Sequence, residues 1–149
     1  MPTSAVVQIL TGAIAPVIVI SGVGLLLLSI SNRYGRAIDR ARLLNRELEE
    51  SEPGHARVKH LEEQLRHMHR RARLLRASMI YSSLSIFFVS LTVLSLFLEG
   101  VLGSHLDFVA LPFFALCLIA LVISMYYSIR DVTLSLAALE LELASTGER

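Results

Sequence analysis

The chain has 149 residues, of which 54% are hydrophobic and 18% carry a charge, whereas about 25% are charged in an average soluble domain. Three stretches, residues 1–32, 77–98 and 108–129, contain no Asp, Glu, Lys or Arg. Each exceeds the roughly 18 residues that mark a candidate membrane span. The pattern excludes an ordinary soluble domain, a secreted disulfide scaffold and a disordered chain, and it predicts a small integral membrane protein.

The first segment, residues 1–32, is expected to hold the first membrane helix, from about residue 13 to 30. A cleaved signal peptide requires a basic region before its apolar run. No basic residue precedes the apolar run here, so this segment is expected to be a retained span. Residues 3–10 are predicted to form a separate interfacial helix, and Pro16 to occupy the first turn of the span. The small residues Ser21, Gly22 and Gly24 favour a close helix–helix contact. The alternative is that backbone carbonyls freed at the glycines line a pore.

The second segment, residues 33–76, is strongly basic and is expected to be cytoplasmic. It holds twelve of the fourteen Lys and Arg residues and seven of the thirteen acids. The positive-inside rule then places the N-terminus outside and the C-terminus inside. Apolar or small residues recur at alternating spacings of three and four on both sides of a turn at residues 51–54, which predicts an antiparallel coiled-coil hairpin. The repeat comprises Leu27, Ile30, Tyr34, Ala37, Ala41, Leu44 and Leu48, then Val58, Leu61, Leu65, Met68, Ala72, Leu75 and Met79.

Polar and basic residues gather where this hairpin meets the membrane. On a helix, Arg33, Arg36 and Arg40 share one face, and Asp39 has the spacing to pair with Arg36. The simplest interpretation is a topology anchor that attracts anionic lipid at about 1 kcal/mol per basic residue. The alternative is a specific site for a lipid headgroup or nucleotide, walled by arginines from both arms, whereas the seven acids argue against nucleic acid. The candidates are Asn32, Arg33, Arg36, Asp39, Arg40, Arg70 and Arg73.

The second span, residues 77–98, carries a stripe of hydroxyl groups within a narrow arc of the helix: Ser78, Ser82, Ser85 and Thr92. Hydroxyls in lipid usually bond to their own helix or bridge to a neighbour. The alternative is a hydrated stripe that faces a central pathway. The outer loop, residues 99–108, holds Glu99, His105 and Asp107, which would form a solvated cap in a monomer and an acidic mouth in a ring.

The third span, residues 109–129, has small residues at Ala120, Ser124 and Ser128, with Cys117 beside them, and these favour helix packing. Its apolar repeat continues through Ile129, Val132, Leu136, Leu139 and Leu143. The repeat predicts a C-terminal cytoplasmic helix at residues 130–149 that packs on the hairpin. No span has an ionisable residue at mid-depth, which counts against an ion-coupled transporter or proton motor.

Motifs for catalysis and cofactors are absent from the sequence. It contains no phosphate-binding glycine loop, no Gly-x-Ser-x-Gly, no His-Glu-x-x-His and no Cys-x-x-Cys. No pair among His55, His60, His67 and His69 has the four-residue spacing that metal sites on helices prefer. We therefore expect neither enzymatic activity nor a catalytic residue, cofactor or metal site.

One motif is fairly specific. Residues Pro16, Ser21-Gly22, Gly24-Leu25-Leu26, Asn32-Arg33, Arg36 and Asp39-Arg40 resemble the opening signature of a family of small bacterial membrane proteins, the domain of unknown function family numbered 2721. The three-span layout of that family is similar over nearly the whole chain. The resemblance implies a multi-pass protein of the bacterial inner membrane and implies no activity.

The predicted fold is therefore all-α, with three membrane helices, a cytoplasmic helical hairpin and a C-terminal cytoplasmic helix. Besides the lipid bilayer, the expected partner is the chain itself. The first functional hypothesis is a homo-oligomeric, ion-conducting or gated pore. The second is a scaffold or regulatory subunit whose cytoplasmic helices dock an unknown protein. The third is binding of an anionic lipid or ligand at the inner-face arginines.

Overall fold

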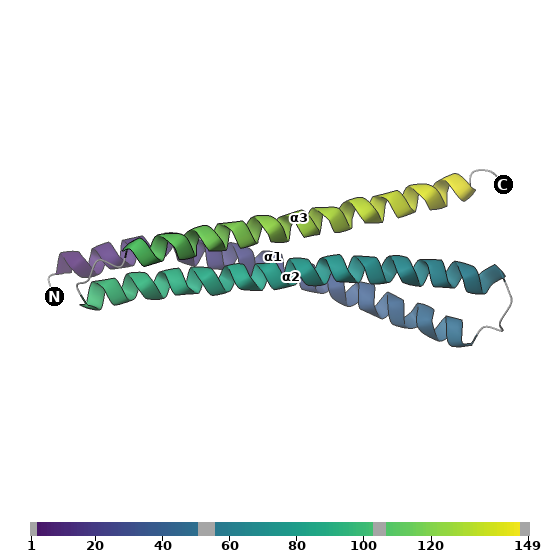
Figure 1. Cartoon of the computed structure of the whole chain (residues 1–149), viewed down its shortest axis with the longest axis horizontal. Helices are drawn as coiled ribbons and strands as arrows, with labels where there is room; N and C mark the ends of the chain where they lie inside the picture. The colour runs from purple at the N-terminus through teal and green to yellow at the C-terminus, as the bar shows by residue number, and fades with distance from the viewer. Residues whose placement is uncertain (1–2, 51–55, 103–106, 147–149) are drawn as a thin grey trace. The chain divides into compact units, whose positions relative to one another are not determined.

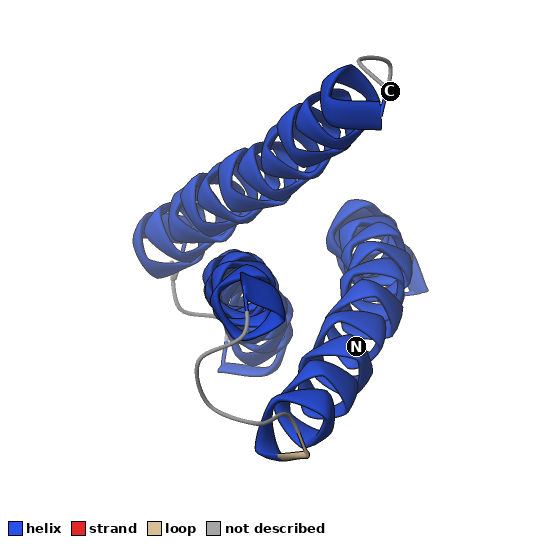
Figure 2. Cartoon of the chain, turned by 90° about the vertical axis from the view of Figure 1, so that its right-hand side faces the viewer, coloured by secondary structure: helices blue, strands red, loops and turns tan. Residues whose placement is uncertain are grey.

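The computed structural model describes residues 3–50, 56–102 and 107–146, and nearly all of them are helical (Figures 1 and 2). The three helices are α1 (Thr3–Glu49), α2 (Ala56–Leu102) and α3 (Asp107–Thr146). Within these ranges no residue belongs to a strand. The predicted all-α class is thus confirmed.

Each helix contains a segment long and apolar enough to cross a membrane: Pro16–Glu49, Leu61–Val101 and Phe108–Ser135. The exposed fractions of Leu25, Leu111 and Val122 are 70%, 73% and 68%. Such exposure is costly in water but not against lipid tails, which are as apolar as leucine itself. The chain is therefore a multi-pass membrane protein whose large apolar side chains suit contact with lipid.

The first helix is longer than its sequence indicated. Residues 3–10 belong to α1 and do not form a separate helix. Pro16 lies inside α1, well beyond its first turn, so the prediction for this residue was wrong. Proline removes one backbone hydrogen bond from a helix, but membrane helices tolerate it because neighbouring groups satisfy the freed carbonyl.

The chain divides into two compact units, each built from parts of all three helices. The first, which we call the apolar unit, comprises Met1–Leu28 and Met79–Ser124. The second, the charged unit, comprises Ser29–Ser78 and Met125–Arg149. The division falls close to the ends of the charge-free stretches, so nearly all the charged residues of the sequence belong to the charged unit.

The core of the apolar unit is built from small and polar residues. On α3, Ala110, Cys117 and Ser124 are buried at intervals of seven residues, which is close to two helical turns. The hydroxyl oxygens of Ser82 and Ser124 lie 2.7 Å apart, within hydrogen-bond distance. The Ser85 hydroxyl lies 3.3 Å from the Cys117 sulfur. Small side chains let α2 and α3 approach closely enough for these polar contacts.

The core of the charged unit follows the predicted repeat on two helices. Ile30, Ala37 and Leu44 are buried on α1, and Leu61 and Leu75 are buried on α2. Seven-residue intervals again turn one face of α1 inward. The apolar spacing therefore identified the buried face of both helices in this unit.

On α3 the predicted repeat was wrong where the side chains are described. Ile129 is 62% exposed and Val132 is 40% exposed, whereas Asp131 between them is fully buried. The large apolar side chains point outward, and the buried face continues the small, polar series of the apolar unit. The side chains of Leu136, Leu139 and Leu143 lie outside the described residues.

Candidate functional site

A single buried carboxylate, that of Asp131, joins all three helices of the charged unit. Its Oδ2 atom accepts a hydrogen bond of 2.7 Å from Nη2 of Arg33 on α1. Its Oδ1 atom accepts a hydrogen bond of 3.2 Å from Nε of Arg71 on α2. One α3 side chain therefore binds α1 and α2 at the same time.

The two arginines make this burial of charge tolerable. Removing an unpaired carboxylate from water costs several kcal/mol, and charge-assisted hydrogen bonds to both oxygens offset that cost. The side chains of Arg33 and Arg71 are 27% and 25% exposed, whereas that of Asp131 is 0% exposed. Each arginine can therefore hold the acid on one side and keep donors free on the other, because a guanidinium has five N–H groups.

Asp131 and Arg71 were not among the candidates that the sequence supplied. The signal for Asp131 was present: it stands seven residues after Ser124, which follows Cys117 and Ala110 at the same interval. This series consists of small or polar residues, so the spacing of the large apolar side chains does not reveal it.

A groove between α1 and α2 in the charged unit is lined mainly by arginines. Its volume is about 210 Å³, and its lining is Arg33, Arg36, Ala37, Arg40, Met68 and Arg71. The three- and four-residue spacings place Arg33, Arg36 and Arg40 on one face of α1. The structure thus brings three predicted arginines together with one that was missed. The predicted ion pair between Arg36 and Asp39 does not form, and both residues are exposed.

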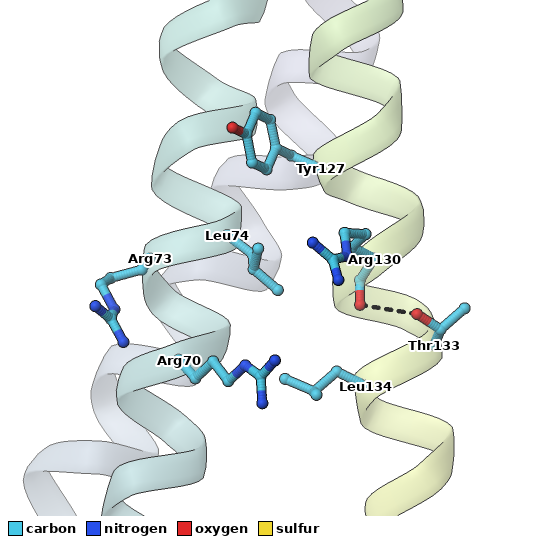
Figure 3. A pocket seen from close by; sticks show the side chains of 7 residues that line it. All are labelled: Arg70, Arg73, Leu74, Tyr127, Arg130, Thr133 and Leu134. Carbon is cyan, nitrogen blue, oxygen red and sulfur yellow. Dashed lines mark hydrogen bonds between the residues drawn. The ribbon is translucent and has the colours of Figure 1, made fainter.

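A second groove lies between α2 and α3 in the same unit (Figure 3). Its volume is about 390 Å³, and its lining is Arg70, Arg73, Leu74, Tyr127, Arg130, Thr133 and Leu134. Figure 3 shows the guanidinium groups of Arg70 and Arg130 reaching into the space between the two helices. The Arg130 guanidinium carbon also lies 5.8 Å from the centre of the Tyr126 ring, a cation–π distance. This groove combines positive and apolar walls.

The small residues of α1 pack against no neighbouring helix in the described part of the chain. A Cβ atom added at Gly22 or Gly24 would meet nothing within 4 Å. The Ser21 hydroxyl donates a hydrogen bond of 3.3 Å to the Val17 carbonyl of its own helix. The predicted helix–helix contact at these residues is therefore not made within the described chain.

The hydroxyl stripe of α2 faces inward. Ser78, Ser82 and Ser85 are fully buried and Thr92 is 4% exposed. Thr92 donates a hydrogen bond of 3.0 Å to the Phe88 carbonyl. The stripe therefore serves contacts within the chain, as hydroxyls in membrane helices commonly do.

The remaining predicted site residues that the structure describes belong to three different helices. Asn32 is exposed on α1. Glu99 lies inside α2 and Asp107 is the first residue of α3, whereas His105 falls outside the described residues. Over the same described ranges, no three His, Cys, Asp or Glu residues gather closely enough to hold a metal ion.

The fold and this ion-paired, arginine-rich unit define a small, all-helical, multi-pass membrane protein. The chain belongs to the family described as Protein of unknown function (DUF2721), whose family model matches residues 13–141. The membership implied by the sequence resemblance is thus confirmed. No curated protein matches the chain, and no solved structure does.

Proposed function

We propose that this membrane protein binds the phosphate headgroup of an anionic lipid in the groove between α2 and α3. The observation that carries the proposal is the lining of this groove, which combines Arg70, Arg73 and Arg130 with the apolar side chains Leu74 and Leu134. In the described part of the chain, no acid forms an ion pair with these three arginines. Guanidinium groups bind phosphate oxygens through paired, charge-assisted hydrogen bonds.

The surrounding charge supports attraction of an anionic lipid. Residues 33–42, 66–76 and 130–131 contain ten arginines and only two aspartates. Each basic residue near an anionic membrane surface contributes about 1 kcal/mol of attraction. That general attraction concentrates anionic lipid, and in the groove the guanidinium groups of Arg70 and Arg130 reach into the space where one headgroup can be held (Figure 3).

The position of the groove along the sequence fits a lipid better than a soluble ligand. Tyr127 belongs to the third charge-free stretch, and Arg130 is the first charged residue after it. Leu74 lies just before the second charge-free stretch, which begins at residue 77. The positive wall is therefore expected at headgroup depth, with apolar surface beside it for the acyl chains.

The test is retention of lipid by purified protein, measured by native mass spectrometry and by lipid titration in nanodiscs. The wild-type protein is expected to retain phosphatidylglycerol and not phosphatidylcholine. The double variant R70Q/R130Q is expected to weaken phosphatidylglycerol binding at least tenfold, because a hydrogen bond to a charged group contributes about 1.5–3 kcal/mol and tenfold corresponds to about 1.4 kcal/mol.

The matched control removes the same charge elsewhere. Arg42 and Arg46 are exposed on α1 and line neither groove, so R42Q/R46Q is expected to leave lipid retention nearly unchanged. An equal loss in both double variants would mean that net charge alone attracts the lipid, and the proposed site would be rejected. Displacement of the bound lipid by millimolar inorganic phosphate would show that the site takes free phosphate instead.

The pore and scaffold hypotheses stay predictions. The hydroxyl stripe gives the pore no support, because Ser82 and Ser85 contact Ser124 and Cys117 inside the apolar unit. A pathway lined by these hydroxyls would require α2 and α3 to separate.

A further inference from the structure

We infer that the groove between α1 and α2 is a second anion site, which binds a soluble anion with two linked phosphate groups through Arg33, Arg36, Arg40 and Arg71. It shares no lining residue with the groove between α2 and α3. The inference therefore does not depend on the lipid site proposed above. The positive-inside rule predicts that the ligand arrives from the cytoplasm.

The charge in this groove is unbalanced. Four guanidinium groups line it, and the one carboxylate that pairs with any of them among the described residues is Asp131, through Arg33 and Arg71. The groove therefore keeps an excess of about three positive charges, which repel one another unless an anion binds. A single phosphate monoester carries about 1.5 to 2 negative charges at pH 7, so two linked phosphate groups match the excess better than one.

Size and lining favour a small soluble anion over a lipid. The groove measures about 210 Å³, below the roughly 300–1,000 Å³ of pockets that enclose drug-sized molecules. Only Ala37 and Met68 contribute apolar surface to its lining. Arg33 and Arg40 stand seven residues apart on α1, a rise of about 10 Å. Linked phosphate groups can reach guanidinium groups along this length, whereas acyl chains would find almost no apolar wall.

Asp131 weakens anion binding at this site, because it already pairs with two of the four guanidinium groups. Its oxygens accept from one nitrogen of Arg33 and one nitrogen of Arg71, so both side chains keep other donors for a ligand. Its negative charge opposes the approach of a second anion. Removal of that charge by Asp131→Asn is therefore expected to tighten anion binding.

The experiment is calorimetric titration of inorganic diphosphate into the full chain, held in nanodiscs of zwitterionic lipid. The wild-type protein is expected to bind diphosphate at least tenfold more tightly than sulfate or inorganic phosphate at equal ionic strength. The variant R36Q/R40Q is expected to bind at least tenfold more weakly, because each substitution removes a charge-assisted contact. The variant R42Q/R46Q, which removes two exposed arginines that line neither groove, is expected to bind as the wild type does.

Three outcomes would overturn the inference. The first is equal affinity for diphosphate and sulfate, and the second is an unchanged affinity in R36Q/R40Q. The third is an equal loss in R36Q/R40Q and R42Q/R46Q, which would indicate a response to total charge. Arg36 and Arg40 are exposed, so their replacement is expected to leave the fold intact, and thermal unfolding checks this. A severalfold gain in D131N supports the inference, and its absence in folded D131N contradicts the role of Asp131.

Discussion

Replacement of Asp131 by alanine is expected to lower the free energy of unfolding by about 2–4 kcal/mol. The change removes the acceptor of both interhelical ion pairs and leaves Arg33 and Arg71 without their partner. Loss of one member of a fully buried ion pair typically costs about 3–5 kcal/mol. The expected value is somewhat lower, because both arginine side chains are about a quarter exposed and water can hydrate the charges left behind. Thermal or denaturant unfolding in mild detergent, followed by circular dichroism, measures the change.

Asp39 provides the matched control, because it is an exposed aspartate on α1 that forms no ion pair in the described chain. Asp39→Ala is expected to change stability by less than about 0.5 kcal/mol. A double-mutant cycle of Arg33→Gln with Asp131→Asn isolates the energy of their contact, and a coupling of about 1–3 kcal/mol is expected. Equal stability of the two alanine variants, or no coupling in the cycle, would contradict the ion-paired arrangement.

Replacement of both Ser82 and Ser85 by leucine is expected to disrupt the apolar unit. Each serine is fully buried against a residue of α3. Insertion of larger side chains into a packed core costs about 1–3 kcal/mol each, and the substitutions also remove two polar contacts between helices. The double variant should therefore lose several degrees of thermal stability, as measured by unfolding in detergent.

The neighbouring exposed hydroxyls offer the control for this experiment. Ser83 and Ser90 face outward on the same helix, so S83L/S90L adds the same apolar bulk without entering the core and is expected to retain wild-type stability. A variant S82L/S85L that keeps its stability would contradict the packed contact. If that stable variant also lost ion flux in liposomes, the result would support the pore hypothesis instead.

The membrane helices could be predicted because charge is so costly in lipid that its absence marks each span. The buried faces of α1 and α2 could be predicted for Ile30, Leu44 and Leu75, since apolar residues are buried in the charged unit as they are in a soluble helical bundle. The same rule failed on α3. There Ile129 and Val132 point outward while Ser124 and Asp131 point inward, because small and polar residues give membrane helices their close contacts.

The site was only partly predictable, because the spacing of arginines on one helix does not reveal which neighbour each will face. Arg70 and Arg71 are adjacent in sequence, yet Arg70 lines the groove with α3 and Arg71 lines the groove with α1. One residue along an α-helix turns the side chain by about 100°. The separation of the two grooves thus depends on the rotation of α2 relative to its neighbours, which a sequence pattern alone does not specify.

The bonds of Asp131 also have a consequence for the order in which the chain assembles. Arg33 and Arg71 lie 98 and 60 residues before their acid, and ribosomes deliver the chain from its N-terminus. Both arginines therefore emerge, and the first two helices can enter the bilayer, before the compensating carboxylate exists. Until α3 is present, neither arginine can form the ion pair that joins it to Asp131, so these two interhelical contacts form only once all three helices are in place.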